Sequence, residues 1–191
     1  MCVVLRDAPH WSVVADTAAL RDDTDEAQQV IFAVSHSTAG QDNPVFVLDG
    51  EKGRVELGYE GWIRATWADG TTDTAEAEAD TRPPGLLEDV VEAATGRRPA
   101  LMCPLALARS QTLCACASFE SSAIHPFPPA LLRAEGEGGR IVVDGIDEAV
   151  RQAGEQGALF SELGLDWAVA GTQIDLAGYT YFPTFRRNVG A

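Results

Sequence analysis

The spacing of apolar residues changes near residue 82, and this change constrains the fold more than any other feature of the sequence. Before it, apolar and polar residues alternate, as around Val55 and Leu57, which is typical of strands with one buried face. After the turn signal Arg82-Pro83-Pro84-Gly85, the apolar residues of 86–94 recur at helical spacing. Strands followed by helices, without regular βαβ alternation, predict an α+β fold with a large, mainly antiparallel sheet and helices packed on one face.

Six segments in the first half are expected to be strands. The second segment carries apolar groups on both faces, which predicts an inner strand, whereas the acidic residues Glu76, Glu78 and Asp80 mark the last segment as a solvated edge. Asp69-Gly70 supplies one of the hairpin turns between them. The expected strands are Trp11–Leu20, Ala27–Ser37, Val45–Leu48, Arg54–Tyr59, Gly61–Trp67 and Thr71–Ala79.

Most of the second half is expected to be helical. A helix over Leu86–Ala94 is followed by Gly96, a residue suited to helix ends, and a second helix begins at Pro104 and runs to about Ser122. The remaining expected elements are a strand over Arg140–Val143, a helix over Ile146–Leu163 and an extended strand over Asp166–Phe182. Because 191 residues lie within the usual span of one domain, residues 1–191 are predicted to form a single domain.

A large sheet with helices on one face leaves its other face uncovered. The large apolar residues expected on such a face are Tyr59, Trp62, Ile63 and Trp67. Together they would exceed the apolar patch that a monomer normally exposes, so the face is expected to meet another protein surface. The sequence therefore predicts a homo-oligomer formed through the sheet face, or pairing with a separately encoded protein.

The charge balance excludes one class of partner. Lys and Arg number 14 against 29 Asp and Glu, which gives a formal net charge of -15 at pH 7. An acidic surface of this kind repels nucleic-acid phosphates and anionic membranes. We therefore expect neither nucleic acid nor membrane as a partner.

The cysteines and the apolar stretches indicate the cellular compartment of the protein. No apolar stretch approaches the roughly 18 residues that span a bilayer, and the first residues lack the pattern of a secretory signal. Cys2, Cys103, Cys114 and Cys116 match no zinc or redox spacing. We expect these cysteines to be reduced in a cytoplasmic protein.

Motifs for catalysis are missing from the sequence. It contains no dinucleotide fingerprint, no phosphate-binding loop and no nucleophile elbow, so no catalytic, cofactor-binding or metal-ligating residue is assigned. Of the three histidines, His36 stands at the end of an apolar strand between two serines, a common place for substrate contacts. His36 is the one candidate substrate-binding residue, and the alternative for it is a hydrogen-bonded histidine at the sheet rim.

Several segments together resemble the C-terminal domain of the Gfo/Idh/MocA family of NAD(P)-dependent oxidoreductases. The resemblance spans roughly residues 11–126. It rests on Leu101–Leu105, Ala108-Arg109, Thr112-Leu113, Phe119–Ser122 and Ile124–Pro126, on the hairpin Gly50–Leu57 and on Ser35-His36-Ser37 preceded by Asp16-Thr17-Ala18.

The resemblance implies a domain that contacts a sugar- or polyol-type substrate and forms oligomers through an open sheet. In that family a separate Rossmann domain binds NAD or NADP, and a Glu-Lys-Pro motif supplies the catalytic lysine. Glu51-Lys52 is not that motif because Gly53 follows it on a hairpin turn. The chain is thus expected to bind no cofactor by itself and to be truncated or stand-alone.

Two other functions remain open. The chain could be a non-catalytic assembly module that pairs with a second copy or with a separately encoded Rossmann protein. It could instead bind a sugar or polyol without chemistry. Arg109 has two interpretations of its own, as a substrate contact or as a residue that stabilises the helix surface.

Overall fold

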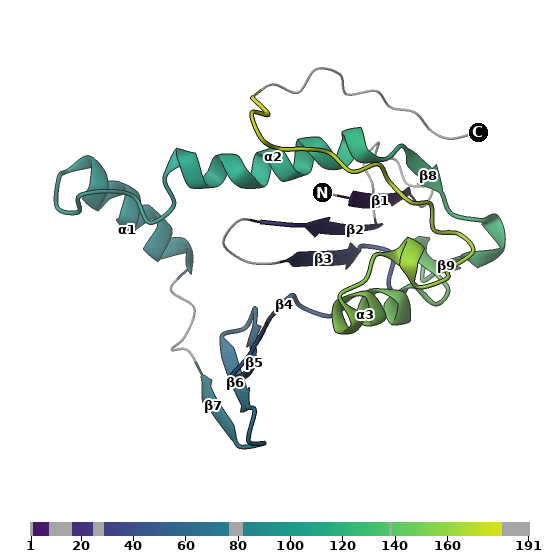
Figure 1. Ribbon diagram of the computed structural model, residues 1–191, viewed down its shortest axis with the longest axis horizontal. Helices are drawn as coiled ribbons and strands as arrows, with labels where there is room; N and C mark the ends of the chain where they lie inside the picture. Colours follow the sequence, from purple (N-terminus) through teal and green to yellow (C-terminus); the bar gives the residue numbers. More distant parts are fainter. Residues whose placement is uncertain (1, 8–16, 25–28, 77–81, 138, 181–191) are drawn as a thin grey trace. The chain divides into compact units, whose positions relative to one another are not determined.

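The computed structural model describes residues 2–7, 17–24, 29–76, 82–137 and 139–180, and it has an α+β fold (Figure 1). Its contacts divide the chain into two compact units, which we describe separately. The first unit comprises residues 1–40 and 105–191, and the second comprises residues 41–104. The strands fall into two four-stranded sheets and one two-stranded sheet. The expectation of one large sheet is therefore wrong for the described residues.

The first unit is built on a mixed sheet with the order β3-β2-β1-β8. Its strands are β1 (Cys2–Asp7), β2 (Thr17–Asp22), β3 (Val30–Ser35) and β8 (Ile124–Pro126). The first three strands are antiparallel neighbours, and β8 runs parallel to β1. The predicted inner strand over Ala27–Ser37 is an edge strand, β3, because β2 is its only partner among the described strands. One of its faces leaves Val30 and Phe32 half exposed.

Two helices cover opposite faces of this sheet. Ala19 pairs directly with Ala33, and both belong to a cluster with α3 (Ile146–Gln156). The neighbouring residues of β2, Ala18 and Leu20, point the other way and pack in a cluster with α2 (Leu105–Ser121). The expectation of helices on only one face is therefore wrong for this sheet, because β2 is apolar on both sides.

The larger core lies on the α3 side. Trp167 packs against the rings of Phe127 and Phe160, with centroids 5.1 and 5.3 Å away. The helix α3 ends at Gly157, whose left-handed φ of 61° lets its N–H reach the Ala153 carbonyl. The chain then forms a short 3-10 turn, η2 (Phe160–Glu162), so the predicted helix over Ile146–Leu163 is shorter than expected.

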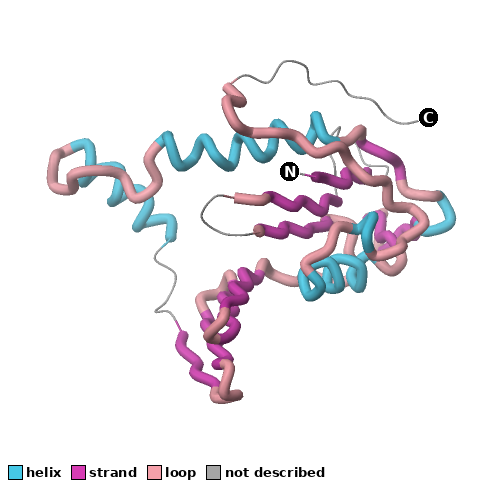
Figure 2. The backbone as a smooth tube through the Cα atoms, in the orientation of Figure 1, coloured by secondary structure: helices cyan, strands magenta, loops and turns pink. Residues whose placement is uncertain are grey.

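Two further segments of the first unit complete it. A 3-10 turn η1 (Pro129–Leu131) precedes a small antiparallel hairpin of β9 (Leu132–Glu135) and β10 (Arg140–Val143). Residues 166–180 contain no strand, contrary to expectation, and Figure 2 shows them as a loop along α2. Their backbone bonds to the helix end instead: the Thr172 N–H donates to the Ser121 carbonyl at 2.7 Å.

The second unit contains an antiparallel meander with the order β4-β5-β6-β7, as the hairpin turns predicted. Its strands are β4 (Val45–Gly50), β5 (Gly53–Gly58), β6 (Trp62–Trp67) and β7 (Thr72–Glu76), and α1 (Arg82–Ala94) follows them. Within the described residues, β7 lies at an edge of this sheet and ends at the acidic Glu76, as predicted, whereas Glu78 and Asp80 lie outside those residues.

A glycine contact explains how Trp62 lies on this sheet. A Cβ atom built on Gly58 would lie 2.0 Å from the Trp62 indole nitrogen, so the ring occupies the space that a side chain would need. Gly58 is accordingly buried although it lies on a thin sheet. The indole and the glycine therefore form a matched pair between β5 and β6.

We predict that Gly58→Ala destabilises the second unit by about 1–3 kcal/mol, because the indole must move away from the new methyl group. Gly50→Ala is the matched control, since the nearest atom to its Cβ would be 3.8 Å away. Hydrogen exchange of the β5 and β6 amides and urea unfolding would measure both variants. Equal stability losses in the two variants would contradict the prediction.

Candidate functional site

The predicted substrate contact, His36, is an exposed residue in the bend that follows β3. Beside it the hydroxyls of Thr17 and Ser35 lie 2.7 Å apart, and the Ser37 N–H donates to the Ser35 hydroxyl at 3.1 Å. Thr17 and Ser37 are fully buried, and the Ser37 hydroxyl has no hydrogen-bond partner among the described residues. His36 thus lies between two serines that are held by hydrogen bonds at the end of β3.

The loop after His36 is fixed by the start of α3. The carboxylate of Asp147 accepts hydrogen bonds from the N–H groups of Ala39 and Gly40, at 3.0 and 3.2 Å. Arg140 donates to the Ala39 carbonyl at 3.0 Å. Burial favours the neutral carboxyl, but the two N–H groups outweigh it, so the pKa of Asp147 is lowered.

The sequence around Asp147 shows no sign of this contact. Its partners are more than 100 residues away in the sequence, so local patterns could not identify it as the residue that holds the loop. The only local signal was an acidic residue in the first turn of a helix. Because Asp147 has no contact with His36 in the described geometry, its role is to position the loop.

We predict that Asp147→Asn lowers the stability at pH 7 by about 1 kcal/mol, because a neutral amide accepts these hydrogen bonds less strongly. The folded pKa lies below the ordinary value of 3.8, so the carboxylate's contribution is present above that value and is lost as the pH falls through the folded pKa. Urea unfolding at pH 7 and at successively lower pH should show the two proteins converging. Asp144→Asn, which removes one exposed pair with Arg133, should change stability little.

Other residues considered from the sequence lie on other elements, and Arg109 is part of α2. Arg109 donates to the Tyr179 carbonyl at 2.8 Å, which supports the interpretation of this arginine as a stabiliser of the helix surface. No group of three or more His, Cys, Asp and Glu within the described ranges is arranged to hold a metal ion. His10 lies outside those ranges, and Glu51 and Lys52 form the turn between β4 and β5.

The sheet of the second unit has one charged face. By the strand register, Asp49, Arg54, Glu56 and Arg64 share this side, which we call the charged sheet face. Arg54 pairs with Asp49 at 3.2 Å and with Glu56 at 3.5 Å, and Arg64 extends the chain of pairs to Glu56 at 3.6 Å. Trp62 lies on this face under the Arg64 guanidinium, 5.8 Å from the ring centre. The expectation that it joins Ile63 and Trp67 on one face is therefore wrong.

The opposite side of the same sheet is apolar. Phe46 and Leu48 of β4 are 65% and 62% exposed, and Ile63 and Trp67 of β6 are also exposed. The indole N–H of Trp67 donates to Asp73 at 2.7 Å, so its polar atom is satisfied at the rim. We call this side the apolar sheet face; its large side chains are Phe46, Leu48, Val55, Leu57, Ile63 and Trp67.

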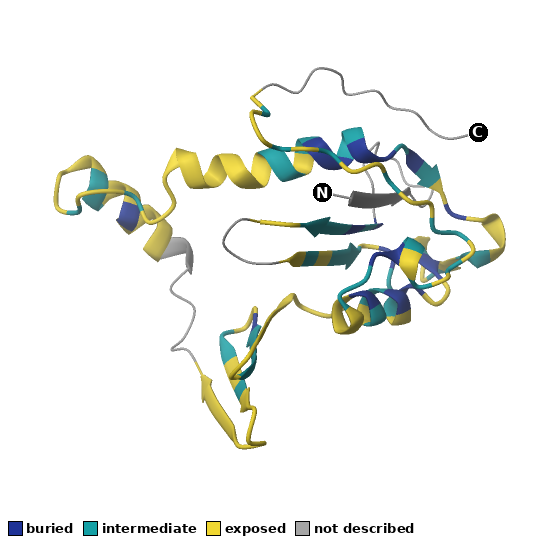
Figure 3. Cartoon of the chain, viewed as in Figure 1, coloured by how far each residue is buried: buried dark blue, intermediate teal, exposed yellow. Residues whose placement is uncertain are grey.

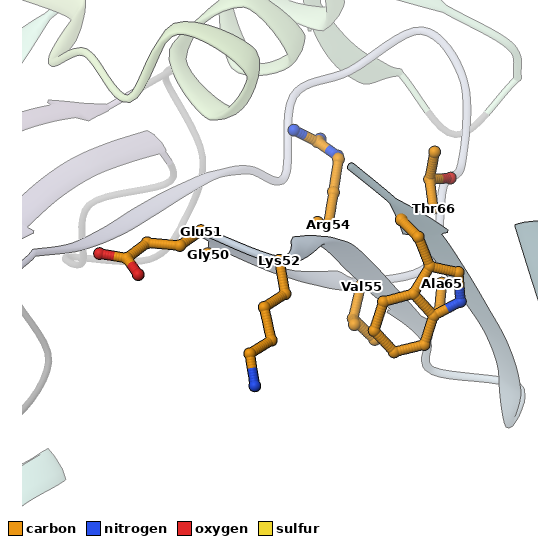
Figure 4. A pocket seen from close by; sticks show the side chains of 9 residues that line it. Gly50, Glu51, Lys52, Arg54, Val55, Ala65 and Thr66 are labelled. Carbon is orange, nitrogen blue, oxygen red and sulfur yellow. The ribbon is translucent and has the colours of Figure 1, made fainter. Parts of the chain in front are cut away.

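The apolar sheet face is hollowed near the β4–β5 turn. A shallow depression of about 380 Å³ lies there, and Trp67 is part of its lining. Figure 4 shows Val55 and Ala65 beside it. Lys52 and Arg54 are the cationic residues in its lining, and Figure 4 shows the Arg54 side chain pointing away from that of Val55. The depression is open, so it suits a protruding side chain of a protein partner better than an enclosed small molecule.

Much of the described part of α1 is exposed, as the colours of Figure 3 show, and its exposed residues include large apolar ones. Leu86 and Leu87 are 69% and 67% exposed, and Val90 and Val91 one turn later are exposed as well. We call these four residues the α1 stripe. The second unit therefore carries two exposed apolar surfaces, one on a sheet and one on a helix.

Comparison of the chain with protein-family models, curated proteins and solved structures finds no match. Within the described residues, no helix has the length and apolar character needed to cross a membrane. Membership of the Gfo/Idh/MocA family is accordingly a proposal that rests on the sequence resemblance.

Proposed function

We propose that this chain is an oligomerisation and substrate-contact module of the Gfo/Idh/MocA type, which pairs two copies through the apolar sheet face and transfers no hydride by itself. The observation that carries the proposal is the contrast between the two sides of the β4–β7 sheet. One side carries charged pairs, with Val45 and Val47 as its exposed apolar residues on β4. The other side exposes the larger Phe46, Leu48, Ile63 and Trp67. Such contrast is typical of a surface that is buried on association.

A face-to-face dimer is the geometry that this sheet favours. Two copies of one surface related by a two-fold axis bring the same residues together, and an apolar surface is compatible with itself in that arrangement. Pairing along β7 is disfavoured instead, because Asp73 and Glu76 stand on that edge and would face like charges. A separately encoded Rossmann protein is the alternative partner for the same face.

The net charge of -15 opposes this association, since two copies repel each other. Salt screens repulsion between exposed charges but leaves apolar burial nearly intact, with a screening length of about 10 Å at 0.1 M. The proposed dimer should therefore strengthen as ionic strength rises. An interface held by ion pairs would weaken under the same change.

We predict that Phe46→Lys weakens the dimer at least tenfold, because it places an unpaired cation in the apolar interface. Val47→Lys is the matched control: it introduces the same side chain one residue away, opposite Glu56 on the charged sheet face. Analytical ultracentrifugation from 1 to about 200 μM would give each dissociation constant. A wild-type protein that stays monomeric throughout, or equal effects of the two variants, would contradict the proposal.

Substrate contact is proposed at the rim around His36. The imidazole of His36 is exposed and can both donate and accept hydrogen bonds, which favours a ligand that is itself rich in hydroxyl groups; the buried Thr17 and Ser37 hold the strand ends around it rather than contact a ligand. Sugars and polyols are such ligands, and they are the substrate class that the family resemblance implies. A role in the cytoplasm is part of the same proposal, and the free thiols of Cys103, Cys114 and Cys116 support it.

We predict that a sugar or polyol in a thermal-shift panel stabilises the protein, by about 2.7 kcal/mol at a hundred times its Kd. NADH and NADPH in the same panel should give no shift at micromolar concentration, because the proposal assigns cofactor binding to a separate domain. His36→Ala should abolish the sugar shift, and Gln173→Ala, an exposed change elsewhere in the same unit, should preserve it. A micromolar response to either nucleotide would overturn this assignment.

A further inference from the structure

We infer that α1 is an autoinhibitory lid: its stripe closes over the apolar sheet face of the same copy and competes there with a second copy. The inference rests on the proposed function, since it names what regulates the same face. Two apolar surfaces within one unit are both exposed, and burying one against the other removes both from water. The closed state is therefore a monomer in which the association surface is covered.

The polar side of α1 is already occupied within its own unit. Asp89 is buried, pairs with Arg98 at 3.1 Å and accepts the Met102 N–H at 3.0 Å. Glu92 pairs with the same arginine at 3.1 Å. These contacts tie the segment that follows the helix to its acidic side. The stripe, on the remaining side, is left as the surface with which α1 can dock.

The dimensions of the two surfaces match. Residues 86–91 rise about 8 Å along the helix, and neighbouring strands lie about 4.8 Å apart, so the stripe covers two to three strands. The sequence places five residues between the end of β7 and the start of α1, a length that reaches about 16 Å when extended. Five residues are therefore enough for the helix to be brought to the face of its own sheet, and a connection of this length is ordinary between a strand and a helix.

Because a short connection, which we call the tether, joins α1 to β7, α1 binds the apolar sheet face more readily than a second copy does. A segment on a short connection has an effective concentration in the millimolar range, well above that of a free protein copy. The dimer then forms only from the fraction of molecules whose lid is open, and the apparent affinity falls by that fraction for each copy. If one molecule in ten is open, removing the lid tightens the dimer about a hundredfold.

The lid is tested by whether the dissociation constant of the dimer falls or rises when the α1 stripe is made polar. Leu87→Gln with Val91→Gln keeps good helix formers on α1 and should tighten the dimer at least tenfold in ultracentrifugation. Glu88→Gln, a change outside the stripe on the same helix, should leave the dissociation constant unchanged. Circular dichroism would verify that helix content is preserved. If the double variant dimerises more weakly, α1 is part of the dimer interface. If its dissociation constant is unchanged, α1 does not compete for the face. Either result overturns the lid.

A crosslink tests the lid independently of the dimer. With Val90→Cys and Ile63→Cys in one chain, a short bismaleimide should join the two residues at concentrations where the protein is monomeric. Val90→Cys with Thr74→Cys, on the charged sheet face, should crosslink at least tenfold less. Peptide mapping distinguishes these products from links to the native cysteines. If every variant stays monomeric, the proposed function fails while the crosslink still decides the lid; equal yields from the two pairs would overturn the lid alone.

Discussion

The first unit depends on the burial of β2 from both sides. Ala19 faces the core around α3, whereas Ala18 and Leu20 face α2, so a strand of small and apolar residues separates two helical layers. Small side chains let both helices approach the sheet closely, which gives dense contacts on each face. The rim that carries His36 extends from the same strands, and the buried Thr17 at the start of β2 holds it through Ser35.

The second unit lacks this two-sided burial, and its functional surface follows from that lack. Its strands place the charged pairs on one side, together with Val45 and Val47, and the largest exposed apolar groups on the other. Gly53 and Gly58 bring the strands and the Trp62 ring closer than any other residue would allow. The backbone of the meander is consequently well defined. Its apolar side is exposed, and we propose that a second copy or α1 buries it.

Local patterns predicted the elements well, because turn residues and periodicity act within a few positions. The hairpins around Asp69-Gly70, the acidic edge at β7 and the helix after Pro104 were all found in this way. The two-sided cover of β2 and the irregular path of residues 166–180 were missed, since they depend on distant partners such as Ser121. Trp62 was misplaced for another reason: strict alternation with Ile63 already puts the two residues on opposite faces.

Charge decides how the lid and the second copy compete. Closing α1 over its own sheet leaves the net charge of one molecule unchanged, whereas pairing two copies brings together two molecules of charge -15. At low ionic strength this repulsion adds to the advantage of the tether and favours the closed monomer. Raising the salt concentration weakens only the electrostatic repulsion between two copies, so it shifts the population toward the dimer. A protein with the α1 stripe made polar should keep this salt dependence, because the repulsion between copies does not involve the lid.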